Sequence, residues 1–174
     1  MRIVDVNAED DNDYLLLVSD ILDNEEFKEL VNYVHHDSNR LQHSLNVSYI
    51  SYCVAKKLKL DYKKVARAAL LHDFFLVDNH NISKFNRFLT LFLHPKYALE
   101  KAKERFELSK MEENIIISHM FPVGLFLPKY KESILVNMVD DYVAIIEACV
   151  SKQKELSAAY SFLFVFMINF IFRW

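Results

Sequence analysis

The sequence predicts an all-α protein, a single compact bundle of helices. The 174-residue chain contains one glycine and three prolines, whereas a multi-stranded protein normally needs more of both at its turns. Hydrophobic residues make up 52% of the chain, enough to close a core and to exclude a disordered protein. Apolar side chains also recur at helical spacing through most of the sequence. We therefore expect helices joined by short connections.

The individual helices can be placed from this spacing and from their end signals. A polar segment, residues 1–12, precedes a helix over 13–22 that Asp13 can cap. Asp61 can cap another helix, and Ser109 with Glu112 forms a capping box for a third. Further helices are predicted over 25–34, 41–58, 62–75, 84–92, 95–106 and 131–150. Breaks are expected over 35–40, 77–83 and 121–128, and at His94–Pro95, because proline favours the first position of a helix.

Charge and cysteine content exclude several classes of protein. The formal net charge of -3 offers no footprint for a nucleic acid polymer. Cys53 and Cys149 lie in apolar helical contexts, which indicates buried thiols in a reduced protein rather than a disulfide. The N-terminus is acidic, unlike a secretory signal. We expect a cytoplasmic protein.

The C-terminal segment differs from the rest of the chain. We assign residues 13–155 to the helical domain and 156–174 to an apolar C-terminal helix. Leu156 to Phe172 is a run of 17 residues without a charge, and at ~1.5 Å per residue it spans about 26 Å, less than the ~30 Å hydrocarbon core of a bilayer. Ser161 and Asn169 within it favour a buried helix or a homodimer seam over membrane association.

A set of histidines and aspartates on separate apolar elements indicates a metal site between helices. Imidazole and carboxylate suit Fe, Mn, Zn, Co or Ni. The pair His72–Asp73 ends a nearly charge-free run, residues 66–75, where a carboxylate is costly unless a metal or a partner neutralises it. Adjacent residues on a helix point about 100° apart, so other helices must complete the site. The candidate residues are His43, His72, Asp73, His94, His119 and Asp140.

These residues and their neighbours resemble a known family. The segments Asn39-Arg-Leu-Gln-His43-Ser, Ala66-Arg-Ala-Ala-Leu-Leu-His72-Asp73, His94-Pro-Lys-Tyr-Ala98, His119 and Val139-Asp140 are similar to the HD-domain superfamily of metal-dependent phosphohydrolases. Members share the pattern H…HD…D, and a subset adds two histidines between the HD pair and the last aspartate. This chain has the longer pattern, over roughly residues 25–150.

The resemblance implies a helical domain with a two-metal site. His43, His72, Asp73 and Asp140 would hold the first metal, and Asp73 would bridge to a second that His94 and His119 complete. A hydroxide between the ions would attack a nucleotide or another small phosphate ester. The expected metals are Fe or Mn, with Co, Ni, Zn or Mg as alternatives. Asp140 is favoured over Asp141 as the last ligand, since relatives usually place a basic or polar residue directly after it.

Three basic residues are candidates for holding the phosphate. Arg40 precedes His43 by about one helical turn, Arg67 precedes His72 by five positions, and Lys96 follows His94. The alternatives are a buried ion pair with an aspartate for Arg67 and a plain surface position for Lys96.

Two other functions remain open at this point. Some relatives with the same six-residue pattern hold a mixed-valent di-iron pair and use dioxygen, and ligand identity alone does not separate them from hydrolases. The third possibility is a non-catalytic, metal-stabilised binding module.

Overall fold

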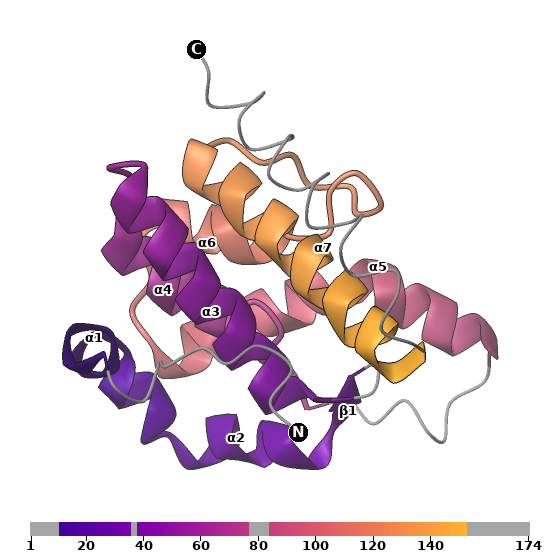
Figure 1. The fold of residues 1–174 in the computed structure, drawn as a ribbon. Coiled ribbons are helices and arrows are strands. Elements are labelled where there is room, and N and C mark those ends of the chain that lie inside the picture. Colours follow the sequence, from indigo (N-terminus) through magenta and orange to yellow (C-terminus); the bar gives the residue numbers. More distant parts are fainter. Residues whose placement is uncertain (1–10, 36–37, 77–83, 153–174) are drawn as a thin grey trace.

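The computed structural model describes residues 11–35, 38–76 and 84–152, and it confirms the all-α fold (Figure 1). A 3₁₀ turn, η2 (Glu29–Asn32), and a two-residue antiparallel strand pair, β1 (Val34–His35) and β2 (Ser38–Asn39), interrupt the helices. The α-helices within these ranges are α1 (Asn12–Leu22), α2 (Glu25–Lys28), α3 (Arg40–Lys57), α4 (Tyr62–Leu71), α5 (Lys84–Arg105), α6 (Lys110–Ser118) and α7 (Lys131–Lys152).

Helix α3 is central to the bundle and packs against both α4 and α7 (Figure 1). Its buried face is unusually polar and rich in small side chains. Ser48 Oγ donates to the carbonyl oxygen of Ala66 on α4 at 2.7 Å and accepts from Tyr14 of α1 at 2.8 Å. Serine and alanine let the two backbones approach closely, and these bonds satisfy hydroxyls that would otherwise be costly to bury. This close packing fixes α3, which carries His43, relative to the end of α4, which His72 and Asp73 directly follow.

The helix caps agree with the sequence at two positions and differ at a third. Asp61 accepts from the backbone N–H of Lys64, and Ser109 with Glu112 forms the complete capping box of α6. Helix α1 is capped by Asp11 instead of Asp13. Asp11 lies three residues before the N–H of Tyr14 that it accepts from, whereas Asp13 sits in the first turn, where its charge still favours the helix dipole.

Three predicted helix boundaries were wrong. The segment predicted as one helix over 25–34 consists of the short helix α2 followed by the 3₁₀ turn η2, and it ends in β1. Helix α4 ends at Leu71 rather than at Phe75, because the His72 ring takes the carbonyl oxygen of Ala69 that the next helical N–H would have used. No break occurs at His94–Pro95: Pro95 lies inside α5. Its fixed φ suits a helix, so the cost is one missing hydrogen bond and the crowding of the ring against the preceding turn.

The predicted loop 77–83, the predicted C-terminal helix 156–174 and all but the last two residues of the predicted polar segment 1–12 lie outside the described residues. Among the helices that the structure does describe, none has the length and apolarity needed to cross a membrane.

Candidate metal centre

The structure brings all six predicted site residues together from five helices. His43 lies in the first turn of α3, His72 and Asp73 directly follow α4, His94 lies within α5, His119 directly follows α6, and Asp140 lies in α7. Each of the six is at most 8% exposed. Taking one ring nitrogen or carboxylate oxygen from each residue, three overlapping groups form in which these atoms lie within 4.8 Å of one another. The groups are His43, His72 and Asp73; His72, His119 and Asp140; and Asp73, His94 and His119.

Two of the histidines are oriented by their own helices. His72 Nδ1 lies 2.7 Å from the carbonyl oxygen of Ala69, and His119 Nδ1 lies 2.8 Å from that of Ile116. A carbonyl can only accept, so each Nδ1 carries the proton and donates it. The neutral form of each ring therefore presents an unprotonated Nε2 to the cluster.

His43 is held by two carboxylates of α7. Its Nε2 lies 2.9 Å from Asp140 Oδ1, and its Nδ1 lies 3.0 Å from Glu147 Oε2. Asn46 donates to the other oxygen of Glu147 at 3.3 Å. Glu147 is completely buried and was missed by the sequence analysis. The spacing in the sequence could have indicated it, because Glu147 follows Asp140 by seven residues. Seven residues are two helical turns, so the two carboxylates share one face of α7.

His94 and His119 form the other side of the cluster. Their Nε2 atoms are 2.9 Å apart, and they lie 3.4 Å and 3.7 Å from Asp73 Oδ1. His72 Nε2 lies 3.9 Å from the second oxygen of Asp73 and 3.5 Å from Asp140 Oδ1. Asp73 thus stands between a His43–His72–Asp140 side and a His94–His119 side.

Burial and charge act in opposite directions on the titration of this cluster. Burial alone would lower the pKa of His43, but Asp140 and Glu147 outweigh it and raise that pKa to about 10. Burial likewise opposes a proton on His72, yet Asp140 and Asp73 raise the pKa of His72. For His119, burial and the neighbouring His94 and His72 lower the pKa to about 3. Without metal, His43 therefore holds a proton at neutral pH, and His119 is neutral.

The two neighbouring aspartates differ in their surroundings. Asp140 is buried against His43 and His72, whose charges hold its pKa well below the usual range despite burial. Asp141 is exposed and belongs to none of the three groups. Partial burial of its carboxyl and the adjacent charge of Asp140 raise the pKa of Asp141 to about 6.

The three basic candidates have different surroundings. Arg40 is buried, its guanidinium stacks 3.8 Å from the centre of the Phe75 ring, and Nη1 donates to the Phe75 carbonyl oxygen. Burial lowers the pKa of Arg40, and the charge of nearby Asp73 opposes this. Arg67 binds both carboxylate oxygens of Asp20 on α1, and the exposed Lys96 lies 3.8 Å from Glu100. Residues two apart on a helix do not share a face, so Lys96 points away from His94.

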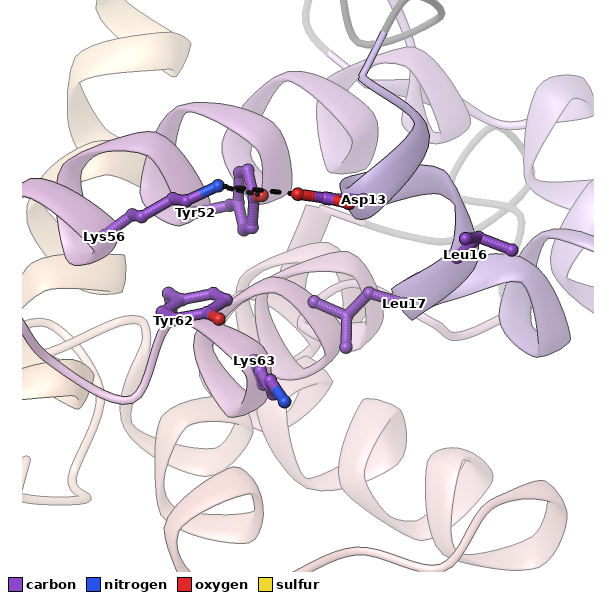
Figure 2. A pocket seen from close by; sticks show the side chains of 7 residues that line it. All are labelled: Asp13, Leu16, Leu17, Tyr52, Lys56, Tyr62 and Lys63. Atoms are coloured by element: carbon purple, nitrogen blue, oxygen red, sulfur yellow. Dashed lines mark hydrogen bonds and ion pairs between the residues drawn. The ribbon is translucent and has the colours of Figure 1, made fainter.

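A separate hollow of about 400 Å³ lies between α1, α3 and α4. Figure 2 shows Lys56 beside Tyr52 and facing Asp13, with Tyr62 and Lys63 on the α4 side. Lys56 donates to the Tyr52 hydroxyl at 3.0 Å and lies 3.9 Å from Asp13. None of the six clustered residues is among those found to line this hollow, so it is not part of the candidate centre.

One of the comparisons with known proteins gives a match, and it covers the cluster. The family model of the HD domain matches residues 40–145, which is more than half of the chain and contains all six residues. Searches of curated proteins and of solved structures gave no match.

Proposed function

The chain belongs to the HD domain family, and on that basis we propose that it is a metal-dependent phosphohydrolase acting on a nucleotide or another small phosphate ester. HD domains bind divalent metals, and members of the family are generally hydrolases. One observation carries the proposal for this chain. Two buried groups of nitrogen and oxygen donors, one with His43 and His72 and one with His94 and His119, share Asp73.

The donor atoms fit divalent ions. His72 Nε2 is buried, and within the described residues it has no hydrogen-bond partner. Such a nitrogen is costly unless something binds its lone pair. His94 and His119 direct two Nε2 atoms at each other beside a carboxylate oxygen, an arrangement that one cation would satisfy. Nitrogen and carboxylate donors together suit Fe or Mn, with Co, Ni, Zn or Mg as alternatives.

We assign His43, His72, Asp73 and Asp140 to one ion and Asp73, His94 and His119 to a second. When bound, such ions activate water as a nucleophile and neutralise charge on a phosphoryl group. Glu147 holds the His43 ring in place through Nδ1, and the helix-end carbonyl oxygens do the same for His72 and His119.

Arg40 is the basic residue that we propose for contact with the substrate phosphate. It is the candidate whose charge acts on Asp73, and its buried Nε has no hydrogen-bond partner among the described residues. A guanidinium presents several donors in a plane, which suits phosphate oxygens. We do not assign this role to Arg67, because its guanidinium is paired with Asp20. We do not assign it to Lys96, because that side chain is exposed to solvent.

The test combines metal analysis with a substrate panel. The full chain is loaded separately with Mn, Fe, Co, Ni, Zn or Mg, and its metal content is measured by mass spectrometry. Phosphate release is then followed for nucleotides and for small phosphate monoesters and diesters. We expect two ions per chain and hydrolysis that chelation abolishes and metal restores. Asp73→Ala should lose metal and activity together, since both assigned ions use Asp73.

The outcomes separate the three functions. A panel without any metal-dependent phosphate release would contradict the hydrolase. Dioxygen consumption by the iron-loaded chain, with an electron paramagnetic resonance signal from iron, would indicate the oxygenase. Two bound metals with neither activity would indicate a binding module.

A further inference from the structure

An apolar protrusion follows His119 in the connection between α6 and α7, residues 120–130. Val123, Leu125, Phe126 and Leu127 are 50%, 89%, 40% and 63% exposed, respectively. Isolated apolar residues on a surface are ordinary, but four large ones within five positions form a patch that normally marks an interaction site. We refer to these four side chains as the apolar tip.

Buried polar side chains hold the backbone of this connection in place. Asn114 of α6 donates to the Leu127 carbonyl oxygen at 3.2 Å and accepts from the Lys129 N–H at 2.8 Å. The hydroxyl of the fully buried Ser133 donates to the same Asn114 oxygen at 2.8 Å. On the other side, Asn137 of α7 donates to the carbonyl oxygens of His119 and Phe121.

The turn at Gly124 completes this support. Its N–H donates to the Met120 carbonyl oxygen at 2.6 Å, and a Cβ at this position would lie 3.1 Å from Met120 Cβ. The connection is therefore folded back on itself, and hydrogen bonds from Asn114 of α6 and Asn137 of α7 hold its backbone. The side chains of the apolar tip are therefore exposed on an ordered, hydrogen-bonded backbone.

The charged residues nearest to the tip in the sequence are lysines. Between Glu113 and Glu132 the sequence has no acidic residue, and it has two lysines, Lys129 and Lys131, both exposed. Apolar side chains flanked by lysines suit the boundary between the acyl chains and the headgroups of an anionic lipid layer. A stable protein interface needs about 800 Å² from each partner, more than four side chains supply, whereas insertion into lipid requires no matching shape.

We propose that the apolar tip inserts into the surface of an anionic membrane, with Lys129 and Lys131 at the headgroups. This interaction does not depend on the proposed hydrolysis. Because the connection that carries the tip begins directly after His119, docking would place the α6 end of the metal centre on the side of the molecule that faces the lipid surface. One such contact gives weak, reversible binding, and stable attachment needs a second signal.

The experiment must separate the tip from the apolar segment 156–172, which could also bind lipid. A Trp174→Phe background removes the sequence's single tryptophan, and Phe126→Trp then places a fluorescent reporter on the tip. Leu16→Trp in the same background is the matched control, because Leu16 is 77% exposed on α1, well away from this connection (Figure 1). Each full-length variant is mixed with vesicles of phosphatidylcholine alone or with added phosphatidylserine.

We expect a blue shift and quenching by brominated lipid for the Phe126→Trp variant on anionic vesicles, and neither for the Leu16→Trp variant. In flotation assays, Leu125→Ser with Leu127→Ser should weaken binding about tenfold or more, and Lys129→Gln with Lys131→Gln should reduce its salt sensitivity. Vesicle binding without a change in the Phe126→Trp emission would overturn the proposal, as would no binding at all. A dimer in light scattering that the double serine variant converts to monomer would overturn it in favour of a self-interface.

Discussion

The orientation of single rings prepares this cluster for cations. His72 and His119 each come directly after the last residue of a helix, and each donates Nδ1–H to the carbonyl oxygen three residues earlier. One hydrogen bond thus fixes the tautomer and the direction of the ring and satisfies a carbonyl at the helix end. The lone pairs on Nε2 are in place before any ion arrives, so metal binding requires little rearrangement.

Glu147 does for His43 what the carbonyl oxygens do for the other two rings. Glu147→Gln keeps the shape of the side chain but removes the charge that makes His43 a stronger metal ligand. We expect metal affinity to fall about 10- to 100-fold, the usual effect of losing such a partner, as measured by competition with a chelating indicator. Glu104→Gln is the matched control, since Glu104 is well exposed and lies 3.6 Å from Lys101. Equal affinity for the two variants would show that Glu147 does not act through His43.

Adjacent aspartates give a second comparison at the residue scale. Asp140→Asn removes a carboxylate that contacts His43 and His72, and we expect it to lose the ion assigned to those residues. Asp141→Asn makes the same chemical change at an exposed position and should retain two ions per chain. Metal content by mass spectrometry and phosphate release together distinguish them. Loss of metal in the Asp141 variant alone would reverse the assignment.

The six clustered residues could be predicted from the sequence, but part of their surroundings could not. The residue types and their order in the chain carry the resemblance to the family. The choice between Asp140 and Asp141 depends on which face of α7 meets α3, since adjacent positions differ by about 100°. Glu147 was missed because one acidic residue in an apolar helix gives no sign of its partner, which is 104 positions away in the chain.

At the scale of elements, one candidate for phosphate binding proves to join two helices. Arg67 of α4 forms a two-pronged pair with Asp20 of α1 and also donates to the Leu17 carbonyl oxygen at 3.1 Å. The sequence offered both interpretations of Arg67, and only the position of α1 decides between them. Charge alone cannot show which neighbour a long side chain will reach.

Arg67→Lys tests this structural role by comparison with Arg40→Lys, the same change beside the cluster. It should lower the free energy of unfolding in urea by about 0.5–1 kcal/mol, a modest value because Asp20 is half exposed and solvent screens the pair. Metal content and hydrolysis should be unchanged. Arg40→Lys keeps the charge but loses the planar stack on Phe75, and we expect it to slow hydrolysis about tenfold or more. A similar loss of activity in both variants would place Arg67 in the site.

Helix α5 shows why proline misled the sequence interpretation. Proline is common at the first position of a helix and costly within one, about 3 kcal/mol, so a break at Pro95 was the sound expectation. The structure keeps α5 continuous through Pro95 and thereby holds His94 within a helix, facing His119. Packing of α5 against α6 overrides the local preference, and such tertiary effects have no local sequence signal.

At the scale of the whole molecule, the centre exists only when five helices are assembled. Its residues span positions 43 to 140, and their carboxylates and imidazoles are buried side by side. In the absence of ions, the raised pKa of His43 means that a proton on this ring balances part of the carboxylate charge. Ions and protons therefore compete for the same nitrogens, and metal affinity becomes linked to pH.

The direction of this linkage follows from the pKa shifts. With the pKa of His43 raised to about 10, the ring is protonated at neutral pH, and an ion must displace that proton. Apparent affinity should therefore rise with pH between 6 and 8, by about tenfold per pH unit for each proton released.

Calorimetry in two buffers of different ionisation enthalpy counts those protons directly. His43→Gln should remove one proton from the count, whereas Asp141→Asn, at an exposed position outside the three groups, should leave the His43 proton in the count. Saturating metal should also raise the melting temperature, and more so at pH 8 than at pH 6, because binding to the folded state alone stabilises it. An affinity that stays constant across this range would mean that the ions do not bind at His43 and His72.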